Sequence, residues 1–208
     1  MLSRLILSSV AILLAMPCYA AEITVSETLV LEINLAEGWS LYLDPPEALL
    51  EETTRQIAHE PAAANATAEQ IESVARRRLA ANEAFVYHTA SGAYLTIDFS
   101  PLELGEAAPS SSNLRNSARS AAKSLAGEEE VADVASDVTP CTVSGTRAAF
   151  QLAADYRQHG HPMKFLGIIG YVEGYWFYLY YTDPGRDPAA FGEMRAMLEK
   201  VAVRQVGH

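Results

Sequence analysis

The segment from residue 143 to residue 183 constrains the fold more than any other part of this chain. It reads VSGTRAAFQLAADYRQHGHPMKFLGIIGYVEGYWFYLYYTD and holds most of the large apolar side chains. In its first part every second residue is large or apolar, as in a strand with one face on a core: Phe150, Leu152, Ala154 and Tyr156. Residues 163–172 and 175–181 are apolar on both faces, which is typical of strands inside a covered sheet. The segment therefore predicts three strands joined by two tight turns, the second at Glu173-Gly174.

Helical and extended patterns fill the rest of the chain and predict an α+β fold. Capping residues and apolar stripes indicate four helices, at residues 44–58, 67–82, 114–125 and 188–201. Asp44 is the expected N-cap of the first helix, and Gly127 is expected to close the third. Extended segments are expected at residues 29–35, 39–43, 85–88, 93–99 and 131–143. We expect residues 21–208 to form one domain, an antiparallel sheet flanked by helices.

The first 20 residues have the pattern of a secretory signal peptide. A short region with Arg4 precedes an apolar run from Leu5 to Met16, and small residues precede Ala21. The run is shorter than the roughly 20 residues that span a bilayer. A lipid-modified Cys18 is the other option, but Met16-Pro17 matches a lipobox poorly. We expect cleavage after Ala20 and a periplasmic or secreted chain without a transmembrane segment.

The charge of the chain excludes some classes of partner. Its net charge is −11, which argues against nucleic acid and against electrostatic binding to anionic membranes. The only dense basic run, at residues 76–78, is a solvated face, pairs with nearby glutamates, or marks a docking surface. Cleavage after Ala20 leaves Cys141 as the single cysteine, so no intramolecular disulfide is expected. A buried, unreactive thiol is the favoured interpretation of Cys141, over a nucleophile or an intermolecular bridge.

One group of residues has the chemistry of a metal site. His159 and His161 lie two residues apart, with Asp155 four residues before the first histidine, and imidazole and carboxylate are suitable ligands for a transition metal. The sequence His-Gly-His-Pro is equally a tight turn in which the side chains point into solvent. No third or fourth ligand has diagnostic spacing, so we expect no metal and no cofactor.

An aromatic cluster is the main candidate for a binding surface. It consists of Tyr171, Tyr175, Trp176, Tyr178 and Tyr180. Cross-strand packing explains such a cluster, but tyrosine hydroxyls also need polar surroundings, so part of the set is expected at a cleft or surface. The sequence contains no GxSxG, phosphate-loop, GxGxxG, HExxH or CxxC motif, which argues against an enzyme.

The order of elements in residues 84–204 resembles the PsbP/Mog1/DcrB-like superfamily. The resemblance rests on a hairpin at residues 85–99, a serine-capped helix at 114–125, three long strands and a C-terminal helix. The small residues from Gly145 to Ala149 and the aromatic run that starts at Gly174 add to it. Residues 45–82 depart from the compact start of that superfamily, and we interpret them as a helical insertion.

The resemblance implies a non-enzymatic role, as an accessory subunit, a chaperone-like adaptor or an envelope protein that binds other proteins. We therefore expect a periplasmic protein, a monomer or small oligomer, that binds another envelope protein. The alternative is a carrier of a small ligand (lipid, glycan or metal), or an unrecognised hydrolase, built on the aromatic cluster. The first hypothesis predicts an exposed aromatic patch. The second predicts a closed pocket with convergent polar groups.

Overall fold

The computed structural model describes residues 19–128, 131–183 and 187–206, and confirms the α+β class. The helices are α1 (Glu47–Ala58), the 3₁₀ turn η1 (Pro61–Ala63), α2 (Ala68–Leu79), α3 (Ser111–Ala126) and α4 (Pro188–Leu198). The large antiparallel sheet has the order β3-β4-β5-β9-β8-β7-β6. Its strands are β3 (Trp39–Tyr42), β4 (Ala84–His88), β5 (Tyr94–Pro101), β6 (Val131–Cys141), β7 (Ala148–Gln158), β8 (His161–Val172) and β9 (Tyr175–Thr182). A small antiparallel sheet contains β1 (Tyr19–Ser26), β2 (Leu29–Leu35) and β10 (Ala202–Gln205).

The three strands expected from the sequence form two consecutive hairpins near the middle of the large sheet. Their two-residue turns are His159-Gly160 and Glu173-Gly174, and all four residues have positive φ. This is the geometry of the turns that best match the twist of paired strands. Both faces of β8 are buried from Leu166 onward, as expected for a strand covered on two sides.

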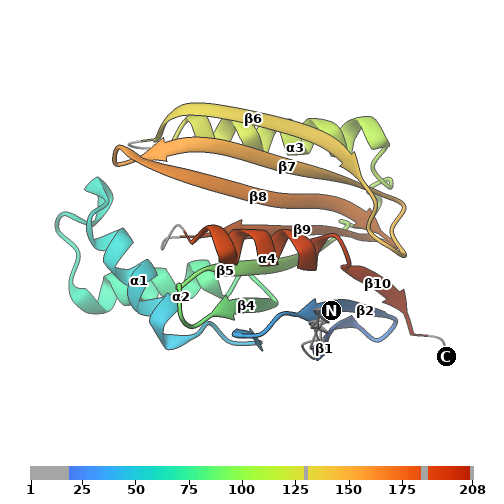
Figure 1. Ribbon diagram of the computed structural model, residues 1–208, viewed down its shortest axis with the longest axis horizontal. Coiled ribbons are helices and arrows are strands. Elements are labelled where there is room, and N and C mark those ends of the chain that lie inside the picture. The colour runs from blue at the N-terminus through green and yellow to red at the C-terminus, as the bar shows by residue number, and fades with distance from the viewer. Residues whose placement is uncertain (1–18, 129–130, 184–186, 207–208) are drawn as a thin grey trace, which may run out of the picture.

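The large sheet has two covered faces (Figure 1). Helix α4 and the small sheet pack on one face, which we call the α4 face, and the main core lies between them. Helix α3 packs on the opposite face, the α3 face, over β6, β7 and β8. Helices α1 and α2 lie over Phe85 and Tyr87 of β4, on the α3 face, at the other end of the sheet. They form the connection between the paired strands β3 and β4, which is the segment interpreted as an insertion.

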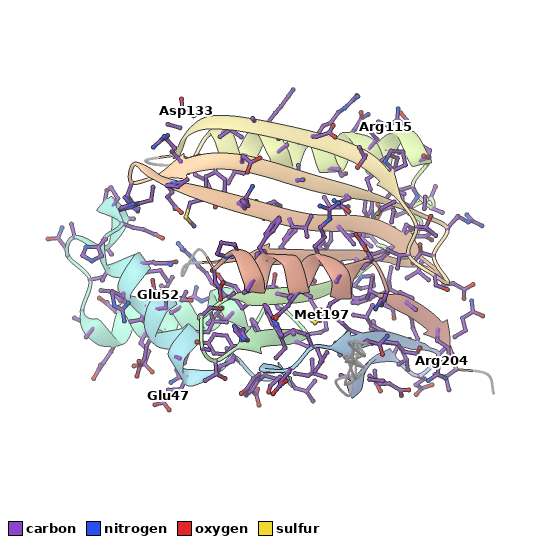
Figure 2. The ribbon with its side chains drawn as sticks, viewed as in Figure 1. Glu47, Glu52, Arg115, Asp133, Met197 and Arg204 are labelled. Atoms are coloured by element: carbon purple, nitrogen blue, oxygen red, sulfur yellow. The ribbon has the colours of Figure 1, made fainter. Side chains whose placement is uncertain are left out.

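Two polar contacts attach α4 to the layers beside it. Trp39 of β3 donates from Nε1 to Glu193 Oε2 at 2.8 Å, and its indole stacks on His88 at 4.9 Å. Met197 of α4 points toward the small sheet (Figure 2), where its sulfur accepts a hydrogen bond from the Ala36 amide at 3.3 Å. The small sheet is linked to the large one by a bridge between Ser144 and Ala202.

The structure corrects several boundaries. Helix α1 begins at Glu47 with Pro46 as its N-cap, so Asp44 is not the cap. If Asp44 were the cap, Pro45 would be the first helical residue, but a residue that precedes a proline is disfavoured in helical conformation. Helix α2 ends at Leu79 and not at Asn82. Gly127 follows α3 with a φ of −97°, so it does not use the left-handed cap conformation.

The sequence predicts only one of the three strands of the small sheet. Residues 29–35 form a strand as expected, but this strand does not join the sheet of β3. The sequence patterns indicate neither β1 nor β10. The leader expected at residues 1–20 lies outside the described residues except for positions 19 and 20, which begin β1. Cleavage after Ala20 would leave Ala21 and Ile23 as the first core residues, and both are buried.

The outer edge of the large sheet is irregular. Strand β6 forms this edge, and its pairing with β7 shifts between Ala132 and Ala135. Asp133 lies inside the shift with a φ of 54°, which is the conformation of a β-bulge. Pro140 lies further along the same strand and provides no N–H group.

Candidate functional site: an aromatic ridge on the α3 face

Strand β9 separates its aromatic side chains between the two faces of the sheet. Phe177, Leu179 and Tyr181 point to the α4 face and are fully buried. Trp176, Tyr178 and Tyr180 alternate with them, so they lie on the α3 face, where they remain partly exposed. Together with Phe165 of β8 they form a row of rings that we call the aromatic ridge.

Each ring of the aromatic ridge contacts the next. The ring centroids of Trp176 and Tyr178 are 6.3 Å apart and the planes differ by only 5°. Tyr178 and Tyr180 are 6.0 Å apart, and Tyr180 and Phe165 are 5.6 Å apart. Contacts of this kind stabilise aromatic pairs by about 0.5–1.5 kcal/mol beyond the area they bury.

A glycine in β8 makes room for one end of the ridge. Gly167 pairs with Tyr180, and the tyrosine ring lies over the glycine backbone. A Cβ atom at Gly167 would lie 2.7 Å from Cδ1 of Tyr180 and 2.9 Å from Cε1 of Phe165. The ring positions therefore depend on the absence of a side chain there. Gly170 makes room for Phe177 in the same way on the α4 face.

Polar residues of β5 lie beside the ridge. Thr96, Asp98 and Ser100 pair directly with Tyr180, Tyr178 and Trp176, and all three are partly exposed. The side chains of paired residues lie on the same face, about 4.5–5.5 Å apart at Cβ. The ridge thus has a polar border that contains one carboxylate, Asp98.

The electrostatic environment of the ridge is acidic. Burial raises the pKa of Asp98, and a hydrogen bond from Ser100 offsets part of this rise. Burial also raises the pKa of Tyr178, and the charges of Asp98 and Glu106 raise it further. Glu83 accepts a hydrogen bond from the Phe99 amide at 2.7 Å, and burial raises its pKa too. In the described part of the chain, neither Asp98 nor Glu83 takes part in an ion pair.

The aromatic ridge is partly exposed, since Trp176, Tyr178 and Tyr180 also pack against the core under α3. One cavity of about 500 Å³ lies between α1, η1 and α2, and another of about 360 Å³ lies between α1 and the β4–β5 hairpin. Neither of these two cavities is lined by a residue of the ridge. The geometry of the ridge therefore resembles the exposed patch of a binding protein more than the pocket of a carrier.

The other two aromatic residues proposed from the sequence have different surroundings. Tyr171 is on the α3 face, but it is buried, and its hydroxyl accepts a hydrogen bond from the Gly174 amide at 3.0 Å. It stabilises the β8–β9 turn. Tyr175 packs against the core on the α4 face. The structure thus brings Trp176, Tyr178 and Tyr180 together, with the buried Tyr171 paired to Trp176 on the same face, and places Tyr175 on the opposite face.

The candidate metal ligands lie at the β7–β8 turn. His159 and His161 are exposed. Asp155 is exposed as well and accepts a hydrogen bond from Lys164 at 2.5 Å, so its charge is already compensated. Across residues 19–128, 131–183 and 187–206, no three His, Cys, Asp or Glu side chains come together as a metal site.

The arginine run at residues 76–78 and Cys141 are two further candidates from the sequence, and their contacts are those of structural residues. Arg76 pairs with Glu72 and Arg78 pairs with Glu60, so two of the three consecutive arginines form ion pairs with nearby glutamates. Cys141 is half-buried, and burial raises the pKa of its thiol to about 11. A thiol with this pKa is almost entirely protonated at neutral pH and is a poor nucleophile.

Sequence reasoning missed Phe165 and Asp98. The alternation in YLTIDFSP already places Thr96, Asp98 and Ser100 on the face opposite Leu95, Ile97 and Phe99. The missing information was that β5 pairs with β9. Their paired residues are far apart in the sequence, from 74 positions for Pro101 and Tyr175 to 88 positions for Tyr94 and Thr182. Without that pairing, Asp98 could not be placed beside Tyr178.

Comparison with known proteins gives structural likeness only. No family model matches the chain, and no curated protein sequence matches it. Among solved structures, LpqN of Mycobacterium tuberculosis, described as involved in cell envelope biogenesis, is similar with a TM-score of 0.52. The match covers 89% of this chain and 91% of LpqN at 10% identity, so it shows a shared fold.

A second match is the cyanobacterial PsbP protein (CyanoP) of Synechocystis sp. PCC 6803, whose structure was determined in solution. Its TM-score is 0.49 at 9% identity, and the match covers 83% of this chain and 86% of CyanoP. The fold implied by the resemblance to the PsbP/Mog1/DcrB-like superfamily, an antiparallel sheet flanked by helices, is confirmed by the strand order and the helices of the structure.

Proposed function

We propose that this chain is a non-enzymatic protein of the bacterial cell envelope that binds another protein through the aromatic ridge. The observation that carries the proposal is the partly exposed row of Trp176, Tyr178, Tyr180 and Phe165. Soluble domains rarely expose contiguous aromatic surface without a binding role, and Trp and Tyr are enriched where protein interfaces are strongest.

The proposed location rests on two further observations. The leader pattern of residues 1–20 supports export with cleavage after Ala20. LpqN, which has the same fold, is described as involved in cell envelope biogenesis, and this supports an envelope role here. Within the described residues, no helix is long and apolar enough to cross a membrane.

Photo-cross-linking in the native host tests the proposal. A benzoylphenylalanine replaces Tyr178 in one variant and the exposed Asp137 of β6 in a control variant. We expect discrete protein adducts from position 178 that are absent from position 137, and the adducts should be lost when Trp176→Ala is added. The mass of the purified, uncross-linked chain should correspond to residues 21–208.

The outcome against the proposal is equally specific. Identical adducts from positions 178 and 137, or none from position 178, would show that the ridge does not contact a protein partner. Circular dichroism of each variant establishes that it is folded before cross-linking is interpreted.

A further inference from the structure

We propose that the segment bound by the aromatic ridge is basic, and that a lysine or arginine side chain of the partner protein lies over Tyr178 and Tyr180 with its charge against Asp98. This inference rests on the proposed function, because it describes the chemistry of the partner at the same surface. It concerns a segment of a protein and not a glycan.

Asp98 and the rings of the ridge lie close enough to bind one cation together. Asp98 of β5 pairs directly with Tyr178 of β9, so its carboxylate borders the rings on the same face. The centroid of Tyr178 lies 6.0 Å from that of Tyr180 and 6.3 Å from that of Trp176. A cation is attracted to an aromatic face when it is within about 6 Å of the centroid. A cationic group over these rings can therefore meet a ring face and a carboxylate together.

The charges around the ridge favour a basic partner. The charges that act on the Tyr178 hydroxyl are those of Asp98 and Glu106, and both are acidic. Arg115 of α3 (Figure 2) is a cation on the same face, but its guanidinium lies over the Phe150 ring, 5.3 Å from the ring centroid, and forms no ion pair with Asp98. No described cation forms an ion pair with Asp98. A basic segment is therefore complementary to this surface, whereas an acidic or phosphorylated segment is repelled.

The carboxylate of Asp98 also distinguishes a basic segment from a glycan. Nearly parallel rings such as those of Trp176 and Tyr178 can stack on a sugar as well as on a cation. A neutral sugar gains little from a half-buried carboxylate that forms no ion pair with any described residue. A cationic side chain supplies that counter-ion, so Asp98 favours the basic segment.

A peptide selection tests the inference with defined probes. A random dodecapeptide library displayed on phage is selected on the purified chain, on Asp98→Asn and on Asp137→Asn. Asp137 is an exposed carboxylate on the edge strand β6, so this variant is a control with the same change of charge. The best peptide is then synthesised, and its affinity is measured by fluorescence anisotropy at two salt concentrations.

The expected result is enrichment of peptides with lysine or arginine on the wild-type chain and on Asp137→Asn, but not on Asp98→Asn. Binding of the synthetic peptide should weaken about tenfold in Asp98→Asn, weaken with added salt, and stay unchanged in Asp137→Asn. Tyr178→Leu should weaken it as well, because this change removes the ring face but keeps the carboxylate.

Several results would overturn the inference. These are failure to enrich any peptide, enrichment of neutral or acidic peptides, and equal affinity for wild type and Asp98→Asn. Binding of neutral oligosaccharides in the absence of peptide binding would assign the ridge to glycans. If position 178 cross-links a protein but the selected peptides are not basic, the proposed function stands and only the inference on charge fails.

Discussion

Asp98 lies in a half-buried position, where its negative charge lowers the stability of the folded chain. Burial disfavours its ionised form, and no cation in the described residues compensates it. A neutral side chain of the same shape would suit the isolated fold better. Residues that lower stability in this way are often kept for binding, which is consistent with the role inferred for Asp98.

Asp98→Asn is predicted to be at least as stable as the wild type at pH 7. The raised pKa of Asp98 means that this carboxyl takes up a proton at higher pH in the folded chain than in the unfolded chain, so its contribution to wild-type stability rises as pH falls toward 3.8, the ordinary value. The variant lacks this contribution, and its advantage should vanish near pH 4. Urea unfolding between pH 4 and 7 measures the difference.

Two other carboxylates provide the comparison for that experiment. Burial raises the pKa of Glu83 and of Glu128, so part of the same pH dependence should remain in Asp98→Asn. Asp137→Asn should follow the wild-type curve. A loss of stability in Asp98→Asn at pH 7 would contradict the interpretation that burial penalises the Asp98 charge.

The two glycines of β8 should differ in their tolerance of alanine. At Gly170 a Cβ would lie 2.2 Å from Cζ of Phe177, a fully buried ring, so we expect a loss of about 3 kcal/mol. At Gly167 the neighbouring rings are partly exposed and can move outward, so we expect a loss of about 1 kcal/mol. Equilibrium urea unfolding measures both.

Gly192 in α4 is a control for these substitutions. A Cβ there meets nothing within 4 Å, so Gly192→Ala should stabilise the chain by about 0.5–1 kcal/mol through helix propensity alone. Equal losses at positions 167 and 170 would show that the two ring contacts are not as different as their burial implies.

At the scale of elements, one close contact joins the two sheets. The Val203 amide of β10 donates to the Ser144 carbonyl at 2.8 Å, beside the bridge between Ser144 and Ala202. Gly145 has a φ of +79°, and a Cβ there would lie 1.8 Å from the Val203 carbonyl oxygen. Only glycine allows β10 to approach the segment before β7 in this way.

Gly145→Ala is predicted to destabilise the chain by about 3 kcal/mol or more, because backbone strain and a steric clash with the backbone add. Amide exchange at Val203 should accelerate more than exchange in β8. Gly105 has a φ of +87° with nothing within 4 Å of its Cβ position, so Gly105→Ala should cost only about 1 kcal/mol. Similar losses in the two variants would contradict the proposed clash.

The sequence predicted elements well where the signal is local. The Thr67 capping box and the Asp187 cap lie at the expected starts of α2 and α4, and a serine, Ser110, caps α3 as expected, three residues before the predicted start of that helix at residue 114. The β7–β8–β9 hairpins follow from turn residues and alternation. β10 has only four residues, and it pairs with β2 about 170 residues earlier at Arg204–Val30 and neighbouring positions, so no local pattern could reveal it. Trp176, Tyr178 and Tyr180 of the ridge were named from the sequence within a wider aromatic cluster, but the position of Asp98 beside them depends on strand order, which no local pattern reveals.

At the scale of the whole molecule, the two faces of the large sheet are covered to different extents. The α4 face is closed by the helix and the small sheet and contains the larger core. The α3 face is covered by α3 at one end and by α1 and α2 at the other, and the aromatic ridge remains partly exposed on β9. A closed core on one side thus supports the surface on the other side that we propose for binding.

The irregular edge at β6 affects how copies of the molecule meet in a crowded compartment. A long, flat edge strand would offer its free backbone groups to a second copy and promote aggregation. The bulge at Asp133 and the missing N–H of Pro140 interrupt such pairing. We therefore expect the β6 edge to be a poor template for pairing with the sheet of a second copy.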